Sequence, residues 1–337
     1  MKAIGYQQAL PIEHADALID ISLPEPLATG RDILVEVKAV SVNPVDTKVR
    51  ENAAPAAGEW KILGWDAAGI VKAVGPEVTL FQPGDRVWYA GDIARSGSNA
   101  EYQLVDERIA GHMPATLDFA QAAALPLTVI TAWEMLFERL QIKPGKANTD
   151  DSLMIVGAAG GVGSIMVQLA RRLTGIKVIG TASRPETHDW LTKLGVHHIL
   201  DHHQPLSREL QKAGLEQVTH VASLNNTQDH FSELVAALAP QGKFGLIDDP
   251  QSLDITALKQ KSLSLHWEFM FTRSMFRTAD MIAQHRLLNE AATLIDAGII
   301  NTTLAHHFGV INAANLRKAH ALIESGKAWG KIVLEGF

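Results

Sequence analysis

The chain of 337 residues contains no cysteine. Without a thiol it can form no disulfide, thiolate nucleophile, iron–sulfur cluster or thiolate zinc site. Its 14 histidines leave a site of histidine and carboxylate ligands formally open. The densest group, His197-His198 with His202-His203, falls on a predicted strand and its exit loop. We interpret this group, like His306-His307, as solvated edge positions, and we predict no metal site.

Basic runs and long apolar runs are also missing. The formal net charge is −7, which argues against nucleic acid as the main partner. The N-terminus lacks the apolar core of a signal peptide, and the longest apolar stretch, residues 122–133, is interrupted by Pro126, Thr128 and Thr131. The length allows two domains. We therefore expect a cytoplasmic globular protein of two domains that spans no membrane.

What the chain does contain is a glycine-rich loop between an apolar run (153–156) and an apolar stripe at helical spacing (165–173). Strand, loop and helix in that order predict a dinucleotide-binding turn, in which Gly160 lets the backbone approach a pyrophosphate and Gly163 lets the helix pack closely. As a sequence motif alone, Ala158-x-Gly160-x-x-Gly163 is weak evidence, because Ala158 replaces the first glycine. The alternative is a glycine-rich turn in another kind of α/β unit. The predicted cofactor contacts are Ala159, Gly160, Gly161, Val162 and Gly163.

The residues after the next predicted strand (176–181) indicate which dinucleotide is bound. An NAD site places an acid there, about 20 residues past the loop, to accept from the ribose 2′-hydroxyl. This chain has Ser183 and Arg184 instead, with no acid until Glu186. A hydroxyl and a guanidinium suit a 2′-phosphate, so we predict NADP(H). The alternative is that Arg184 is an ordinary loop charge.

The order of the predicted elements indicates the fold class. The first part is rich in strands, among them residues 32–40 and 68–74, and the period becomes helical from about Ala120. A polar linker, residues 148–152, leads into the glycine-loop strand. Strands and helices then alternate, which predicts an α/β fold with a doubly wound parallel sheet. The later predicted elements are strands at 198–201, 218–223, 242–247 and 330–334, and helices at 229–238, 279–297 and 313–326.

This organisation resembles the medium-chain dehydrogenase/reductase superfamily over essentially the whole chain. The likeness is greatest to the quinone oxidoreductase branch and extends to the group often labelled zinc-type alcohol dehydrogenase-like. It implies a discontinuous GroES-like catalytic domain (1–128 and 273–337) and a Rossmann NADP-binding domain (129–272). The segments that carry it are 41–48, 64–69, 83–87, 125–134 and 158–163.

The resemblance also indicates chemistry without zinc. Zinc-dependent members carry a cysteine near position 43, Gly-His-Glu at positions 64–66 and a lobe of four cysteines. Here the corresponding residues are Asn43 and Trp65, and cysteine is absent. A catalytic zinc needs three protein ligands, and without it an alcohol loses its usual activation. The expected acceptors are therefore quinones or activated C=C bonds.

Asn43 is the first predicted catalytic residue. The presence of Asn43, Pro44 and Asp46 can be explained without any function, because these residue types are favoured at the start of a helix. Quinone oxidoreductases, however, carry asparagine at this place and tyrosine five residues on, both lining the substrate pocket. This chain has Lys48 there, similar to alkenal and enone reductases, in which the lysine contacts the nicotinamide ribose; an ordinary exposed lysine is the alternative. Tyr89 is a candidate proton donor or, alternatively, a half-buried packing residue.

Further cofactor contacts follow from the resemblance alone. Thr128 corresponds to a threonine facing the nicotinamide, and Lys331 to a lysine near the 2′-phosphate. Aromatic stretches are more often core than cofactor wall. The remaining predicted contacts are Ser223, Asn225, Ile247, Phe269 and Phe271.

Together these features predict an NADPH-dependent oxidoreductase that transfers hydride to a small electrophilic acceptor, either a quinone or an enone or 2-alkenal. One alternative is an alcohol dehydrogenase that uses another metal or none. A second is a non-catalytic, crystallin-like or regulatory NADPH-binding protein. By analogy we expect a homodimer.

Overall fold

The computed structural model describes residues 1–147 and 149–337 and divides into two compact units. The first unit consists of Met1–Ile130 and Phe271–Phe337, and the second of Thr131–Met270. Residue 148, at the start of the predicted linker, lies outside the described residues.

The first unit is built on a seven-stranded sheet in the order β15-β16-β3-β5-β6-β8, in which β7 also pairs with β3. Its pairs are antiparallel except for β15 with β16. A three-stranded sheet, β2-β1-β4, accompanies it. The strands of the unit are β1 (Lys2–Tyr6), β2 (Ile19–Ser22), β3 (Asp32–Val42), β4 (Lys61–Ile62), β5 (Ala67–Val74), β6 (Arg86–Tyr89), β7 (Tyr102–Asp106), β8 (Ala110–His112), β15 (Leu304–His307) and β16 (Lys331–Glu335).

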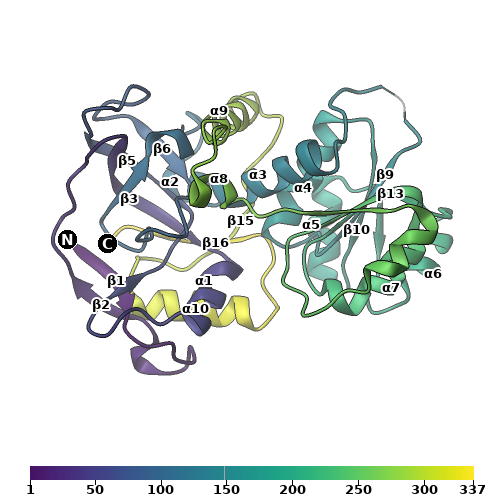
Figure 1. The fold of residues 1–337 in the computed structure, drawn as a ribbon, viewed down its shortest axis with the longest axis horizontal. Helices are drawn as coiled ribbons and strands as arrows, with labels where there is room; N and C mark the ends of the chain where they lie inside the picture. Colours follow the sequence, from purple (N-terminus) through teal and green to yellow (C-terminus); the bar gives the residue numbers. More distant parts are fainter. Residues whose placement is uncertain (148) are drawn as a thin grey trace. The chain divides into compact units, whose positions relative to one another are not determined.

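Short helices connect these strands, and α1 and α10 contact each other (Figure 1). Helix α1 begins after Asn43 because Pro44 suits the first helical position and the Asp46 carboxylate accepts a hydrogen bond from the Asn43 N–H at 2.7 Å. The helical segments are η1 (Ala15–Ala17), α1 (Pro44–Asn52), η2 (Glu107–Ile109), α2 (Phe119–Ala123), α3 (Pro126–Trp133), α8 (Thr272–Phe276), α9 (Ala283–Asp296) and α10 (Ala313–Glu324).

The second unit contains a six-stranded parallel sheet in the order β11-β10-β9-β12-β13-β14 (Figure 1). After β11 the chain crosses to β12 on the other side of β9, so the strand order reverses between β9 and β12. This arrangement confirms the predicted doubly wound parallel sheet. Its strands are β9 (Ser152–Val156), β10 (Lys177–Thr181), β11 (His198–Leu200), β12 (Val218–Ser223), β13 (Leu238–Leu246) and β14 (Ser264–Trp267). Its helical segments are η3 (Glu134–Arg139, a π-helical turn), α4 (Gly161–Leu173), α5 (Pro185–Leu194), α6 (Leu206–Lys212), α7 (Thr227–Ala237) and η4 (Ile255–Lys261).

Helix α4 shows why the glycine loop is held in place. Its apolar stripe, including Ile165, Met166 and Leu169, is fully buried, and the helix contacts β9 and β10. Full burial of a side chain of this size contributes about 1.5–3 kcal/mol. The stripe therefore fixes the N-terminus of α4 at the carboxyl end of β9.

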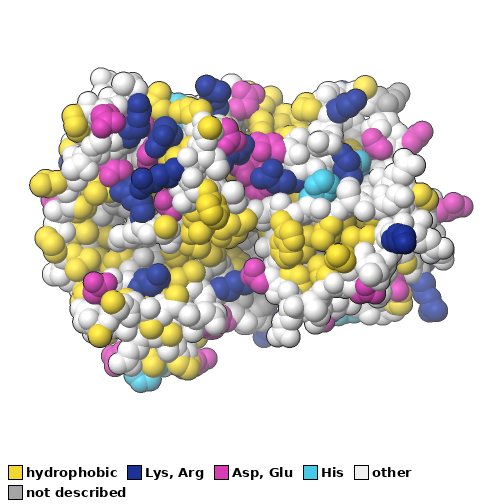
Figure 2. Space-filling view, viewed as in Figure 1, with side chains coloured by type: hydrophobic (Ala, Val, Ile, Leu, Met, Phe, Trp, Pro, Cys, Tyr) yellow, Lys and Arg dark blue, Asp and Glu magenta, His cyan; other side chains and the backbone are white. Residues whose placement is uncertain are grey.

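One helical stretch, Phe119–Arg139, is long and apolar enough to cross a membrane by length and composition alone. Of its most apolar window, 83% is buried inside the protein, as in the core helix of a globular fold. The sequence did not predict so long a stretch because Pro126 counted as a break, whereas this proline begins α3. Figure 2 shows acidic and basic side chains interspersed on the face viewed.

Candidate active site and cofactor-binding residues

Strand register in the first unit brings three polar residues together where β3 ends. Antiparallel pairing sets Ile332 of β16 opposite Val42, so Lys331 lies opposite Asn43. On the other side of β3, the Ser41 N–H donates to the backbone carbonyl of Asp66 at 3.0 Å. Lysine, asparagine and aspartate from three distant segments therefore meet at this point.

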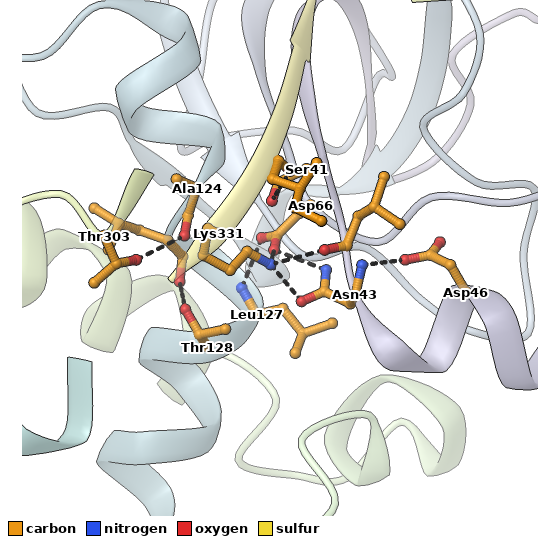
Figure 3. A network of polar contacts seen from close by, with 12 residues as sticks. Ser41, Asn43, Asp46, Asp66, Ala124, Leu127, Thr128, Thr303 and Lys331 are labelled. Carbon is orange, nitrogen blue, oxygen red and sulfur yellow. Dashed lines mark hydrogen bonds and ion pairs between the residues drawn. The ribbon is translucent and has the colours of Figure 1, made fainter. Parts of the chain in front are cut away.

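These three side chains form a network of polar contacts, the Asn43–Asp66–Lys331 network (Figure 3). The Lys331 ammonium donates to Asn43 Oδ1, to Asp66 Oδ2 at 2.9 Å and to the Val42 carbonyl at 3.4 Å. Asn43 Nδ2 donates to Asp66 Oδ2 at 2.9 Å, and the Leu127 N–H donates to Asp66 Oδ1 at 2.8 Å. The exposed fractions of Asn43, Asp66 and Lys331 are 1%, 0% and 3%. The network is therefore buried, and each of its charges has a partner.

Burial governs the acidity of the two aspartates here. It raises the pKa of Asp66 above its ordinary value, while the Lys331 ammonium and the donors from Leu127 and Asn43 oppose the rise. Because the Asp66 carboxylate accepts three hydrogen bonds, we assign it as the ionised partner of Lys331. Burial raises the pKa of Asp46 to about 7, with the Asn43 N–H and the Lys331 ammonium limiting the rise and the Asp66 charge adding to it. Asp46 therefore titrates near neutral pH.

The predicted catalytic residues on α1 differ in environment. Asn43 precedes the helix, but its side chain makes no capping hydrogen bond and is directed into the network instead. Lys48 is exposed on the same helix. Thr128, at the start of α3, is 2% exposed and donates through Oγ1 to the Leu125 carbonyl at 2.9 Å.

Tyr89 differs from its predicted environment. The side chain is fully buried rather than half-buried, because β6 lies inside the sheet between β5 and β8. Among the described residues no hydrogen-bond partner is found for its hydroxyl. Burial raises the pKa of the Tyr89 hydroxyl above its ordinary value. A group that is buried, weakly acidic and unconnected to a proton path is a poor proton donor, so the packing interpretation replaces the catalytic one.

The contacts of Lys331 also differ from its predicted role. Its predicted partner was the 2′-phosphate of the cofactor, but its ammonium is buried and donates to Asn43, Asp66 and Val42. An ammonium has three donors, and these acceptors use all of them. The structure thus makes Lys331 an internal counter-ion of Asp66, a role that requires the register of β16 against β3.

The residues at positions 43, 65 and 66 do not fit a catalytic zinc. Trp65 is 1% exposed, its Nε1 donates to the Asp92 carbonyl at 3.3 Å, and its ring meets Phe271 edge-on with centroids 6.1 Å apart. Asn43 and Asp66 already bind the ammonium of Lys331. Within residues 1–147 and 149–337, no group of three or more His, Asp or Glu is arranged to hold a metal ion. Asn43 and Asp66 therefore serve as acceptors for the internal ammonium of Lys331. A catalytic zinc would require three nitrogen, sulfur or carboxylate ligands.

In the second unit the glycine loop joins β9 to α4 with the geometry that a pyrophosphate requires. A Cβ on Gly163 would lie 2.5 Å from both Ala158 Cα and the Gly157 carbonyl oxygen, so glycine is needed there for close packing. A Cβ on Gly160 would meet only the Gly157 oxygen, at 3.4 Å, which leaves room for a ligand beside the backbone. Gly161 and Val162 follow in the first turn of α4, where N–H groups have no intrahelical partner. These residues fit a dinucleotide.

Ser183 and Arg184 follow β10 as the sequence predicts. Arg184 precedes α5, and its guanidinium lies 3.5 Å from the Glu186 carboxylate. Ser183 Oγ lies 3.2 Å from Nε2 of His202, which follows β11. A hydroxyl, a guanidinium and an imidazole therefore lie near the carboxyl ends of two neighbouring strands.

The other predicted contacts of this unit follow β12 and β13. Ser223 is fully buried, and its Oγ lies 2.8 Å from Thr227 Oγ1. Asn225 is exposed. It lies beside the glycine loop, because a Cβ added at Gly157 would be 2.6 Å from Asn225 Oδ1. The Ile247 N–H donates to the Ser223 carbonyl at 3.3 Å. All of them lie at the strand ends where parallel sheets bind ligands.

Phe269 and Phe271 have opposite environments. Phe269, in the second unit, is 47% exposed, whereas Phe271, which precedes α8 in the first unit, is 2% exposed and packs on Trp65. Their proposed backbone contacts with the carboxamide stay predictions.

Three residues of these sites were not predicted from the sequence. Asp66 lies within the segment 64–69 that carries the resemblance but was given no role, and Asp46 was noted only as a helix-start residue. His202 was grouped with solvated edge residues. An acid next to a missing metal ligand was the one signal for Asp66, and no local pattern marked His202.

Comparison with known proteins agrees with this fold. The alcohol dehydrogenase GroES-like domain model matches residues 29–116, and the zinc-binding dehydrogenase model matches residues 194–334. A zinc-type alcohol dehydrogenase-like protein of Staphylococcus aureus is 39% identical over 336 residues, which cover 99% of each chain.

Solved structures give the same result. A Rhizobium etli protein assigned to the zinc-dependent alcohol dehydrogenases is 56% identical, with a TM-score of 0.96 over 100% of this chain and 98% of that one. Escherichia coli quinone oxidoreductase complexed with NADPH is 25% identical, with a TM-score of 0.84 over 99% and 100% of the two chains.

The GroES-like sheet and the doubly wound parallel sheet define an oxidoreductase built of two compact units. The chain belongs to the medium-chain dehydrogenase/reductase superfamily, as its sequence predicts.

Proposed function

We propose that this protein is an NADPH-dependent reductase that transfers hydride, without zinc, to quinones or to the activated C=C bonds of enones and 2-alkenals. The observation that carries the proposal is the buried Asn43–Asp66–Lys331 network. It holds an ammonium at positions where zinc-dependent relatives place metal ligands. Acceptors that take hydride without a Lewis acid are therefore favoured.

The glycine loop and the pair after β10 are assigned to the cofactor. The first turn of α4 would hold the pyrophosphate through backbone N–H groups, and Ser183 with Arg184 would hold the 2′-phosphate. When bound, the reduced nicotinamide supplies the hydride. The absence of an acid directly after β10 supports NADPH over NADH, because a carboxylate would repel the 2′-phosphate.

Asn43 and Lys48 are assigned to the acceptor. Reduction places negative charge on the acceptor oxygen, and donors aimed at such an oxygen lower the barrier. One amide hydrogen of Asn43 is donated to Asp66, and we assign the second to the acceptor oxygen. The exposed ammonium of Lys48 adds a positive field. The proton that completes reduction is assigned to solvent, since Tyr89 is fully buried.

The test is NADPH oxidation by the purified protein with an ortho-quinone and, in parallel, with a medium-length 2-alkenal. Each reaction is repeated with NADH. Faster turnover of either acceptor with NADPH supports the proposal, and the preferred acceptor identifies the substrate class. Equal or faster turnover with NADH would contradict the cofactor assignment, and turnover of neither acceptor would favour a binding protein without catalysis.

A second candidate is an alcohol dehydrogenase, which the names of the Staphylococcus aureus and Rhizobium etli relatives favour. Its test is the zinc content of the purified protein together with NADP⁺-dependent oxidation of primary and secondary alcohols. About one zinc per chain, with activity lost to a chelator, would favour this candidate over the reductase.

A further inference from the structure

Nitrogen-bearing side chains lie near the carboxyl ends of β10 and β11 in the second unit. Ser183 Oγ lies 3.2 Å from His202 Nε2. The His202 ring lies 4.7 Å from that of His203 and 6.4 Å from that of His230 on α7, measured between centroids. Arg184 follows Ser183 and acts on the charge of His202. His202, which contacts the Ser183 hydroxyl, therefore has two further histidines and an arginine near it.

Sheet register explains why these distant residues meet. Parallel β10 and β11 pair Thr181 with Leu200. Ser183 and His202 each follow two residues beyond this pair, so both leave the sheet at its carboxyl edge, where parallel sheets bind ligands. The position of His202 beside Ser183 is thus a property of the sheet and not of an accidental loop conformation.

The charges around His202 favour an anion. Burial lowers the pKa of His202, and the charges of His203, His230 and Arg184 lower it further, while the charge of Asp201 opposes this shift. The guanidinium of Arg184 itself lies 3.5 Å from the Glu186 carboxylate. The imidazole is consequently neutral at pH 7 until a negative ligand arrives.

We propose that His202 completes, with Ser183 and Arg184, a site for the 2′-phosphate of NADPH and takes up a proton when that phosphate binds. This inference rests on the proposed function, because it concerns the same cofactor. A phosphate dianion beside the ring favours the imidazolium, whose two N–H groups both donate. NADH lacks this phosphate, so preference for NADPH declines as the pH rises.

The test measures binding rather than turnover. NADPH and NADH are titrated by calorimetry into the full-length protein between pH 7 and 8.5, in two buffers of different ionisation enthalpy. At these pH values the phosphate is largely dianionic, since its second pKa is about 6. We expect up to one proton to be taken up with NADPH and none with NADH. NADPH affinity should fall by up to about tenfold per pH unit, which is the limit for one linked proton.

The variant His202→Gln keeps a hydrogen-bonding side chain beside Ser183 but does not titrate. It should bind NADPH about tenfold more weakly at pH 7, the size of one lost charge-assisted hydrogen bond, with no proton uptake and unchanged NADH affinity. His266→Gln is the matched control, because His266 Nε2 also contacts a serine, Ser264, at 3.1 Å, but on β14 at the opposite edge of the sheet. It should behave as the wild type.

The outcomes separate this inference from the proposed function. NADPH binding without proton uptake, or proton uptake that persists in His202→Gln, overturns the inference and leaves the reductase proposal standing. Equal weakening of NADPH and NADH by His202→Gln overturns it too, because His202 would then be structural. Failure of the wild type to bind NADPH at all overturns both.

Discussion

The ammonium of Lys331 lies 2.9 Å from Oδ2 of Asp66, and both side chains are buried although 265 positions separate them in the chain. Two opposite charges out of water are stable only when their remaining hydrogen-bonding capacity is used. Asn43 and the Leu127 N–H provide those contacts. The pair therefore ties β16 and the end of β3 to the segment that precedes β5.

Replacing Lys331 by methionine should strongly destabilise the protein. The substitution leaves the Asp66 carboxylate buried without its cation, and breaking a buried pair in this way costs about 3–5 kcal/mol. The measurement is the free energy of unfolding in urea. The double variant Lys331→Met with Asp66→Asn removes both charges and should recover part of the loss; an equally unstable double variant would contradict the pairing.

The same Lys331 variant tests where this lysine acts. If the ammonium belongs to the network, NADPH and NADH binding should change by the same factor. A selective loss of NADPH affinity would instead restore the 2′-phosphate role that the resemblance implies. Fluorescence titration with both cofactors distinguishes the two cases.

Asp46 should make stability depend on pH. Its pKa is about 7 in the folded protein against an ordinary value of 3.8, so the fold favours the protonated form. This stabilisation is complete below the ordinary value and is lost as the pH rises through about 7. Asp46→Asn should therefore raise the free energy of unfolding at pH 8 by up to a few kcal/mol, roughly the size of that shift, and flatten its pH dependence. Asp118→Asn, at an exposed helix start, is the control and should leave the pH dependence as it is.

Two glycines of the loop should respond differently to alanine. Gly163→Ala places a methyl group 2.5 Å from backbone atoms, so α4 must shift, at a cost of about 1–3 kcal/mol in thermal unfolding. Gly160→Ala has room in the folded protein and should unfold like the wild type, yet bind NADPH at least tenfold more weakly, because the methyl group occupies the approach to the backbone (roughly one lost hydrogen bond). Unchanged NADPH affinity in Gly160→Ala would argue against pyrophosphate binding at this loop.

Lys48→Met should lower turnover with little change in folding. We expect a fall of about tenfold or more in kcat, in line with the loss of one electrostatic stabiliser. Lys318→Met is the matched control, since Lys318 is likewise exposed on a helix, α10, that contacts α1. Turnover that is the same in both variants would remove Lys48 from the mechanism.

The exposed edge of the parallel sheet is the surface on which we expect the homodimer. Among the described residues β14 pairs with β13 alone, and Trp267 and Phe269 beside this edge are 52% and 47% exposed. Edge strands with large apolar side chains tend to pair with another chain. Trp267→Lys should shift a dimer towards monomer in sedimentation velocity, while Phe276→Lys, in the first unit, should not. A wild-type monomer at micromolar concentration would contradict the expectation.

Most elements of the second unit could be predicted because each carries its own periodic pattern. The strand at 218–223 has the predicted bounds, and α7 lies within two residues of its predicted range. The predicted helix from 279 begins only at Ala283. Asp280 instead pairs with Arg273 at 2.9 Å, a contact between segments that no local pattern contains.

The candidate sites were predictable only in part, for the same reason. Gly160 and Gly163 are needed by the local geometry of one strand–turn–helix unit, and Ser183 and Arg184 lie in the loop directly after the next strand, β10. Lys331 was placed by resemblance at the cofactor, and nothing near it in the chain indicates Asp66 as its partner. A site residue could therefore be predicted where its role depends on neighbours in the sequence, and could not where its role depends on contacts between strands that are distant in the sequence.

The sequence by itself determined the α/β architecture, the dinucleotide turn and the absence of thiolate chemistry, because apolar period, glycine position and composition act within a few residues. Only the tertiary structure decided that Asn43, Asp66 and Lys331 form one buried network and that His202 lies beside Ser183. Those contacts depend on which strands are neighbours and in what register, and backbone hydrogen bonds between distant segments set both.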